Sequence, residues 1–237
     1  MILISKARSA LYYFKYLSLF QRLGLPKARR EEISKGFIKK FLPPSPVVVD
    51  CGAYDGADTI ALADILNAKV YAFEAVPEIY MALCKRARPK KNIYCFNMAL
   101  SNVSGKQKFF VSGGKSDASS SLLQPKEHLN DHPETYFKNQ IEVDAITLDD
   151  WAEKNNIQTV DLLWLDMQGF ELKMLEASPR ILSTVKAIHT EVSTKETYEG
   201  VELYSVYKAF LEANGFVAAV EAIPPGWDMG NVLFVRK

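Results

Sequence analysis

The sequence predicts an α/β fold: a doubly wound, mostly parallel sheet of seven strands with an antiparallel strand at its C-terminus, preceded by a helical extension. Three observations predict this fold. From residue 47 onward, five short apolar strands alternate with helical segments, which is typical of a parallel sheet covered by helices. The first strand, 47–49, is three consecutive valines without alternation, as expected when both faces are buried. The last two apolar segments flank a Pro-Pro-Gly turn, so we expect them to pair antiparallel.

Composition divides the chain into two unequal parts. The chain has 237 residues, of which 48% are hydrophobic, enough for one domain with a large core and an appendage. Residues 1–42 contain ten Lys or Arg and two Glu, whereas the whole chain has a net charge of only +1. We therefore separate a basic, aromatic helical extension at 1–42 from a main domain at 43–237. Because the positive charge is confined to the extension, no nucleic-acid partner is expected.

The extension is expected to form two helices, at 5–22 and 30–41. The first combines aromatic side chains with four Lys or Arg. We favour packing of its aromatic side on the main domain. The alternative is peripheral contact with an anionic membrane surface.

The cysteines and the lack of export signals predict a cytoplasmic protein. It would be membrane-associated only if the basic extension contacts a membrane surface. Cys51, Cys84 and Cys95 show no metal-ligand spacing and are typical of a reducing compartment. No apolar run approaches the ~20 residues of a spanning helix, and no signal-peptide cleavage site is evident.

The main domain follows the prolines at 43, 44 and 46, which end the extension. A capping box formed by Thr147 and Asp150 predicts one helix start, and Gly215 predicts a helix end. A short hairpin or edge segment is expected at 104–114. A long polar loop, acting as a lid or substrate loop or lacking order, is expected at 113–140. Strands are expected at 47–50, 69–74, 92–97, 161–166, 186–193, 216–221 and 231–236, and helices at 58–66, from 77, after 147, after 169 and at 203–215.

The loop after the first strand carries the pattern D-x-G-x-x-x-G, with Asp50, Gly52 and Gly56. This spacing differs from the G-x-G-x-x-G of dinucleotide-binding turns, and no Gly-Lys-Ser/Thr follows to make a P-loop. The second strand ends in Glu74, whose carboxylate can accept hydrogen bonds from two ribose hydroxyls. The loop together with Glu74 favours a cofactor that contains a nucleoside, whereas the glycine spacing disfavours NAD. The alternative is a Gly-rich turn that serves only packing, with Glu74 at the surface by chance.

Four carboxylates fall at or near the C-terminal ends of expected strands. Because parallel strands end at the same edge of the sheet, where ligands bind, one rim is expected to carry all four. Some of them can instead cap helices or bind loop amides. They are Asp50, Glu74, Asp166 and Glu191.

From residue 47 to the C-terminus the chain resembles the FkbM-type family of S-adenosylmethionine-dependent methyltransferases. The resemblance implies a class I methyltransferase fold, which is Rossmann-like, and S-adenosylmethionine as cofactor. Residues 1–42 fall outside it. The segments that carry it are, in order, VVVDCGAYDGADT, VYAFEAVP, NMALSNVSG, ITLDDW, LLWLDMQGFE and GF…NVLFVR.

The resemblance also implies which residues bind the cofactor. The loop 50–56 would hold its methionine part, Glu74 its ribose, and the segment 98–100 would line its adenine. Many relatives have Asn where this chain has Tyr54, a departure within the cofactor loop. The expected cofactor-binding residues are Asp50, Gly52, Ala53, Tyr54, Asp55, Gly56, Glu74, Ala75, Ala99, Leu100 and Asp166.

Methylation of a hydroxyl on a sugar, glycan or secondary metabolite is the expected reaction, with N-methylation or a peptide acceptor left open. A hydroxyl acceptor must lose a proton to a carboxylate or His within hydrogen-bond reach. Asp166 is the first candidate because its strand is expected beside the first one. His189 and Glu191 are the second pair, since residues two apart share one face of a strand. A buried structural role is the alternative for His189.

No required metal is expected, although Asp166, Glu171 and Glu191 together offer oxygen ligands that suit a divalent cation. His128 and His132 have helical spacing but fall in a polar loop, where metal binding is not expected. Ser residues at 119–121 resemble a Ser-containing stretch of the family and are candidates for substrate or cofactor contact. The alternative function is a noncatalytic protein that binds a partner or a membrane through residues 1–42. The oligomeric state is not specified by the sequence.

Overall fold

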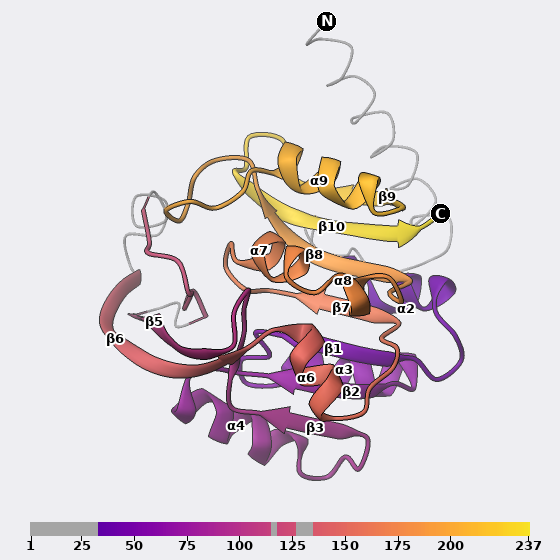
Figure 1. The fold of residues 1–237 in the computed structure, drawn as a ribbon, viewed down its shortest axis with the longest axis horizontal. Coiled ribbons are helices and arrows are strands. Elements are labelled where there is room, and N and C mark those ends of the chain that lie inside the picture. The colour runs from indigo at the N-terminus through magenta and orange to yellow at the C-terminus, as the bar shows by residue number, and fades with distance from the viewer. Residues whose placement is uncertain (1–32, 115–117, 127–134) are drawn as a thin grey trace, which may run out of the picture.

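The computed structural model describes residues 33–114, 118–126 and 135–237. Its centre is a seven-stranded sheet with the order β3-β2-β1-β7-β8-β10-β9 (Figure 1). The first five strands in this order pair in parallel, whereas β10 is antiparallel to both its neighbours, which confirms the predicted doubly wound sheet. The strands are β1 Val47–Cys51, β2 Lys69–Phe73, β3 Ile93–Phe96, β7 Leu162–Leu165, β8 Ala187–Ser193, β9 Phe216–Ala222 and β10 Met229–Arg236.

Strand β1 lies in the middle of the parallel part, between β2 and β7. Its side chains alternate between two core clusters: Val49 packs into one and Val48 into the other, and both are fully buried. Both faces are therefore apolar, which explains the run of valines without alternation.

Helices cover both faces of the sheet (Figure 1). Side chains of α6, α7, α8 and α9 pack into the cluster on one face, and those of α2, α3 and α4 into the cluster on the other. The Thr147 hydroxyl accepts the Asp150 backbone N–H at the start of α6, as predicted. The helices are α2 Lys35–Ile38, η1 Lys39–Phe41, α3 Ala57–Leu66, α4 Pro77–Ala87, α6 Leu148–Lys154, α7 Glu171–Glu176, α8 Pro179–Leu182 and α9 Tyr204–Ala213.

Residues 33–42 pack against the α3 side of the sheet. Ile33 and Ile38 are buried in its core cluster. The Lys35 ammonium lies 2.5 Å from an Asp58 oxygen and 4.3 Å from the centre of the Trp164 ring. The predicted helix at 5–22 and the start of the one at 30–41 lie outside the described residues. Of the helices within the described ranges, none combines the length and the apolar character that a bilayer span requires.

A second sheet of three strands stands beside the first, with the order β4-β6-β5. Its strands are β4 Ala99–Leu100, β5 Gly105–Gly114 and β6 Thr135–Ile146. Of the two alternatives expected at 104–114, the structure has the edge segment and not the hairpin, because β5 is one long strand at the edge of this sheet. The loop expected at 113–140 contains the beginning of β6. Residues 115–117 and 127–134, with His128 and His132, lie outside the description. The strands β5 and β6 belong to the segment 101–146. The two ends of this segment meet where the Ser101 N–H donates to the Ile146 carbonyl at 2.9 Å.

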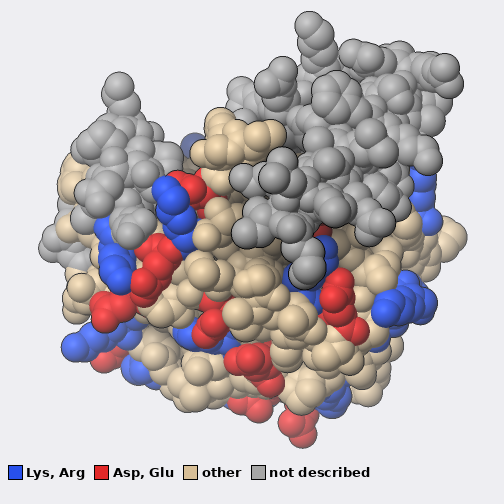
Figure 2. Space-filling model, turned by 90° about the horizontal axis from the view of Figure 1, so that it is seen from above, with Lys and Arg blue, Asp and Glu red and all other residues tan. Residues whose placement is uncertain are grey.

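Charged side chains of both signs are mixed over one face of the described part of the molecule. On the face shown in Figure 2, Lys and Arg stand among Asp and Glu rather than in one patch. Pairs such as Lys90 with Asp64 and Lys106 with Asp144 are largely exposed. Exposed pairs of this kind contribute little to stability, so the fold depends on its core clusters.

Candidate active site

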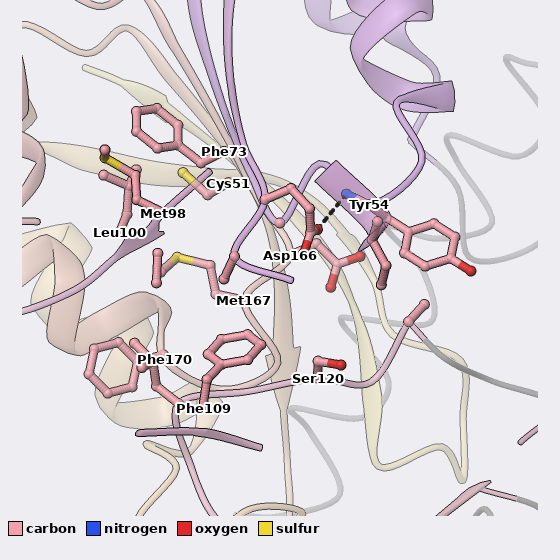
Figure 3. Close-up of a pocket in the computed structure, with 17 residues that line it drawn as sticks. Cys51, Tyr54, Phe73, Met98, Leu100, Phe109, Ser120, Asp166, Met167 and Phe170 are labelled. Carbon is pink, nitrogen blue, oxygen red and sulfur yellow. Dashed lines mark hydrogen bonds between the residues drawn. The ribbon is translucent and has the colours of Figure 1, made fainter. Parts of the chain in front are cut away.

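A cleft opens at the carboxyl ends of β1, β2 and β7, with about 650 Å³ of empty volume that includes open solvent. Apolar side chains, among them Phe73, Leu100 and Phe170, line one side of it, whereas Asp166 and Ser120 lie on the other (Figure 3). Such a cleft suits a ligand with one flat apolar part and one polar part. The predicted cofactor-binding residues that line it are Gly52, Tyr54, Glu74, Ala75, Ala99, Leu100 and Asp166.

The Glu74 carboxylate joins two loops at the floor of the cleft. One oxygen accepts the Tyr54 N–H at 3.0 Å, the dashed bond in Figure 3, and the other accepts the Val76 N–H at 2.8 Å. Burial raises its pKa to about 7, although these amide bonds act against the shift. Each carboxylate oxygen has a further lone pair, so Glu74 can still accept hydrogen bonds from a ligand.

Gly52 lies where the loops after β1 and β7 touch. Its φ is +80°, and a Cβ at this position would lie 1.9 Å from the Asp166 carbonyl oxygen. The Asp166 N–H donates to the Cys51 carbonyl at 3.0 Å. Only glycine fits this contact, since any side chain would push the two loops apart. Tyr54 has a φ of +48°, which is uncommon for a residue with a side chain and indicates local strain.

Asp50 lies behind the cleft and does not line it. Its carboxylate accepts the Thr59 hydroxyl at 2.6 Å, and burial raises its pKa to about 7. Asp50 therefore ties β1 to α3 and can act on a ligand only through the loop that it supports.

The other predicted loop residues also support the cleft from outside. Ala53 is buried in a small apolar cluster. Asp55 accepts the Ala57 N–H at 3.0 Å and pairs with Arg86 at 2.5 Å. Gly56 packs closely on Leu83 of α4. These contacts fix the loop conformation that presents Gly52 and Tyr54.

Asp166 and Glu191 are joined by the side chain of Gln168, which is not among the predicted site residues. The Gln168 amide nitrogen donates to Asp166 Oδ1 at 2.8 Å and to Glu191 Oε2 at 3.1 Å. The Asp166 carboxylate is open to the cleft but has dense protein around it, and this desolvation raises its pKa. Burial also raises the pKa of Glu191 well above its usual value, and the charges of Asp166 and Glu171 add to the shift.

Glu171 lies beneath the same turn and is 4% exposed. Its carboxylate accepts the Met167 N–H at 2.8 Å, and burial raises its pKa to about 7. Over the described part of the chain, no three His, Cys, Asp or Glu side chains are arranged to hold a metal ion.

His189 is 5% exposed and does not line the cleft. Its ring stacks on Trp164 with centroids 3.7 Å apart, and neither ring nitrogen has a hydrogen-bond partner among the described residues. Burial lowers its pKa to about 3, and the charge of Lys35 acts in the same direction. The structure therefore places this candidate base within the core.

Three further polar residues shape the site without having been selected from the sequence. Asn97 donates to the carbonyls of Glu74 and Ala75 at 3.0 and 3.1 Å, which ties the loops after β2 and β3 together. Gln168 and Tyr198 meet at 2.9 Å. Gln168 lies just after an expected strand end, which is a position typical of site residues and could have indicated its role. Tyr198 lies five residues after the end of β8, and no sequence pattern indicates its role.

Comparison with known proteins decides the family. The model of the methyltransferase FkbM domain matches residues 50–218. This chain belongs to the FkbM methyltransferase family. The matched region begins at Asp50 and includes every residue placed at the cleft above, so the cleft lies within the methyltransferase domain.

A curated relative agrees with this identification, and two solved structures share the fold. The methyltransferase is 30% identical over 196 residues to the 2-O-methyltransferase NoeI of Sinorhizobium fredii, across 78% of this chain and 81% of the relative. It is also similar in fold to an rRNA methylase of Streptococcus thermophilus, with a TM-score of 0.50, 16% identity, and coverage of 89% of this chain and 98% of that one. The TrmK protein of M. capricolum, solved with S-adenosylhomocysteine, gives a TM-score of 0.50 at 10% identity, with coverage of 88% and 70%. The methyltransferase therefore has the predicted class I fold.

Proposed function

We propose that this methyltransferase transfers the methyl group of S-adenosylmethionine to a hydroxyl of a sugar, glycan or secondary metabolite. The observation that carries the proposal is that Glu74 and Asp166 line the same cleft. We assign Glu74 to the ribose and Asp166 to the proton of the acceptor hydroxyl. The 2-O-methyltransferase name of the relative NoeI supports a hydroxyl acceptor.

The residues of the cleft fit this cofactor. The apolar side, with Phe73, Met98 and Leu100, suits an adenine ring. The free lone pairs of Glu74 suit a ribose diol, and a charged acceptor strengthens each of these hydrogen bonds. Because Gly52 has no side chain, a ligand in the cleft could approach the backbone closely at this point. TrmK, which has the same fold, was solved with the related product S-adenosylhomocysteine.

The chain itself has two tasks in this reaction. S-adenosylmethionine, when bound, supplies a methyl carbon that is already activated by positively charged sulfur. The protein must therefore hold the acceptor in line, which can contribute ~7 to 11 kcal/mol, and remove the hydroxyl proton. Asp166 opens into the cleft beside Gly52 and is the proton acceptor that we assign. Glu191, the other predicted base, does not line the cleft and is linked to Asp166 only through the Gln168 amide.

Isothermal titration with S-adenosylmethionine at pH 8, above the pKa of about 7 to which burial raises Glu74, tests the cofactor assignment. Glu74→Gln keeps the shape of the side chain but removes its charge, and we expect affinity to fall by about 10-fold or more because charge-assisted hydrogen bonds are lost. Glu78→Gln, at an exposed position on α4, is the matched control and should bind like the wild type. Wild-type protein that does not bind, or Glu74→Gln protein that binds equally well, would overturn the assignment.

The acceptor class is tested by incubating the enzyme and S-adenosylmethionine with a panel of methyl glycosides. We expect a product whose mass is increased by one CH₂ unit, formed together with S-adenosylhomocysteine. Simple primary amines serve as competing acceptors. Methylation of the amines but of none of the glycosides contradicts the hydroxyl assignment and leaves the cofactor assignment intact.

A further inference from the structure

The turn after β7 contains a strained residue whose side chain points back to the strand ends. Gln168 has a φ of +53°, and Gly169 follows it with a φ of +96°. A residue with a side chain adopts positive φ only when its surroundings compensate for a cost of ~1 to 3 kcal/mol, and such residues gather at functional sites. The contacts of the Gln168 side chain show what this conformation achieves.

The carboxamide of Gln168 lies between two carboxylates and one phenol. Its nitrogen has two hydrogens, and the two nearest acceptors are Asp166 Oδ1 at 2.8 Å and Glu191 Oε2 at 3.1 Å. Its oxygen accepts the Tyr198 hydroxyl at 2.9 Å. The reverse orientation would place the amide oxygen against two groups that only accept hydrogen bonds when ionised, so this network defines the orientation.

The same turn is held from a second direction by the wall of the cleft. The Ser121 hydroxyl donates to the Gln168 carbonyl at 2.9 Å. Tyr198 Oη also lies 2.9 Å from the Ser119 carbonyl, and Tyr198 forms a β-bridge with Pro125. Gln168 is therefore held at its backbone carbonyl by Ser121 and at its side-chain oxygen by Tyr198.

Without the Gln168 amide between them, neither the Asp166 nor the Glu191 carboxyl group would have this donor to fix its orientation. Gln168 donates one N–H to each of these two carboxyl groups, and the N–H donated to Asp166 occupies its Oδ1. Asp166 Oδ2 has no hydrogen-bond partner within the described ranges, and Asp166 lines the cleft. The bridge thus leaves one oxygen of Asp166 available to a ligand.

We propose that Gln168, oriented by Tyr198, is a positioning residue that holds Asp166 with one oxygen toward the acceptor hydroxyl. This inference rests on the proposed function, because it assigns a role within the same site. Gln168 does not line the cleft, so its removal should affect the catalytic step and not cofactor binding.

Substitution of Gln168 by Met tests the proposal, since Met has a similar length and no polar hydrogens. We expect kcat with the best methyl glycoside of the panel to fall by about 100-fold, the loss associated with a misplacement of ~1 Å. The Kd for S-adenosylmethionine should stay within threefold of the wild type. Gln168→Glu, which replaces the donor by a third carboxylate, should lose at least as much. Gln158→Met, at an exposed loop position, is the matched control.

Tyr198→Phe tests the second half of the proposal. This variant leaves the amide bridge in place but frees its orientation, so we expect a smaller fall in kcat, about 10-fold, again with little change in cofactor Kd. Tyr94→Phe on the exposed edge strand β3 is its control. Retention of kcat by Gln168→Met, or a loss that appears only as weaker cofactor binding, overturns the proposal.

A crystal structure of the Gln168→Met variant decides the matter without an acceptor. An Asp166 carboxylate turned away from its native position supports the positioning role, and an unchanged carboxylate contradicts it. Failure of the wild type to bind S-adenosylmethionine would instead refute the proposed function, so the two failures are distinguishable.

Discussion

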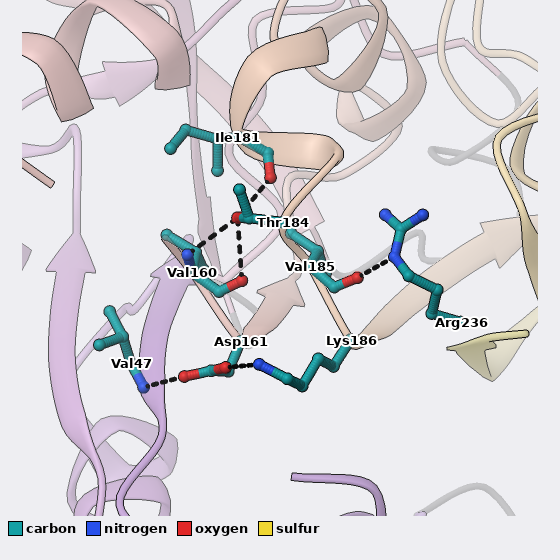
Figure 4. A network of polar contacts seen from close by, with 8 residues as sticks. All are labelled: Val47, Val160, Asp161, Ile181, Thr184, Val185, Lys186 and Arg236. Atoms are coloured by element: carbon teal, nitrogen blue, oxygen red, sulfur yellow. Dashed lines mark hydrogen bonds and ion pairs between the residues drawn. The ribbon is translucent and has the colours of Figure 1, made fainter. Parts of the chain in front are cut away.

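Asp161 and Asp166 flank the same short strand, β7, yet the chain surrounds them in opposite ways. Asp161, at the N-terminal end, accepts the Val47 N–H at 2.9 Å and forms an ion pair with Lys186 (Figure 4). Asp166, at the C-terminal end, has Glu191 as its neighbour across Gln168. One carboxylate has an amide and a cation as partners, and the other stands among like charges.

The residues around the two ends of β7 differ in the same way as Asp161 and Asp166. Near Asp161, Thr184 accepts the Val160 N–H at 3.0 Å, and Arg236 donates to the Val185 carbonyl at 2.6 Å (Figure 4). Near Asp166, Tyr54 and Gln168 both have positive φ. At the other end of the strands, the residues with positive φ are Asn67 and Asn156, a residue type that adopts this conformation more readily than Tyr or Gln. We expect the end with paired charges to stabilise the sheet and the end with crowded carboxyl groups to serve ligand binding.

The largest effect is expected from Asp166→Asn. Loss of the proton acceptor should lower kcat by about 10²- to 10⁴-fold, whereas the unfolding temperature should stay the same or rise because one crowded charge is removed. Product formation with the methyl glycoside and thermal unfolding measure the two outcomes. Asp64→Asn, in an exposed pair with Lys90, should change neither. A variant that unfolds at a clearly lower temperature would contradict the contrast.

The opposite result is expected from Asp161→Ala. The Val47 N–H loses its acceptor and Lys186 its partner, which should lower the free energy of unfolding by about 2 to 3 kcal/mol. Most of this comes from the amide, because the Lys186 side chain is 49% exposed. Cofactor Kd should not change. Chemical denaturation and titration calorimetry provide the measurements, and Asp161→Asn, which keeps an oxygen for Val47, should cost less.

The pH dependence of stability separates the two ends further. Burial raises the pKa of Glu171 to about 7, so the folded protein binds this proton more tightly than the unfolded chain does. Stability from this group is therefore full below about pH 4.5 and is lost as pH rises through 7. Glu171→Gln, which can still accept the Met167 N–H, should raise the free energy of unfolding at pH 8 by about 1 to 2 kcal/mol.

This gain should vanish near pH 5, where Glu171 is already protonated in the fold. Denaturant titrations at the two pH values measure it, and Glu153→Gln on the exposed side of α6 is the control. An equal effect of Glu171→Gln at both pH values would count against the crowding of charge at this rim.

The smallest effect is expected from Thr184→Val. The variant keeps the shape of the side chain but leaves the Val160 N–H without its acceptor, which should cost about 1 kcal/mol of unfolding free energy. Thermal unfolding detects this loss. Thr194→Val is an exposed comparison, and activity should be unaffected by either change. A loss of activity in Thr184→Val protein would show that the two ends are coupled.

Local patterns predicted the main sheet because both of its faces are buried. The valines of β1 and the capping box at Thr147 are each visible within a few residues of sequence. The pairing of the expected edge segment, β5, with β6 was missed for the opposite reason. Its polar residues, such as Lys106 and Asp144, stand exposed, and its register shifts at Val111, so neither strand shows a clean alternation.

The same distinction applies to the site. Gly52 and Glu74 belong to short motifs, and the structure places both at the cleft. The bridge from Gln168 to Tyr198 joins residues separated by 30 positions, which no local pattern reveals. His189 was selected as a candidate base because it lies two residues before Glu191. The structure stacks it on Trp164 of the neighbouring strand, a contact that depends on strand register.

The hydrogen bond between Ser101 and Ile146 makes the intervening segment an exchangeable cassette. The chain leaves and re-enters the main domain at points already joined at 2.9 Å. Because closing a loop costs only ~0.6 kcal/mol more for each doubling of its length, segments of other lengths can be grafted there with little penalty to the main sheet. The cassette contributes Phe109 and Ser120 to the cleft but none of the strands that carry Gly52, Glu74 and Asp166. Because Ser119 and Ser121 of this segment contact Tyr198 and the Gln168 carbonyl, a graft that keeps these two contacts is expected to leave Asp166 in place.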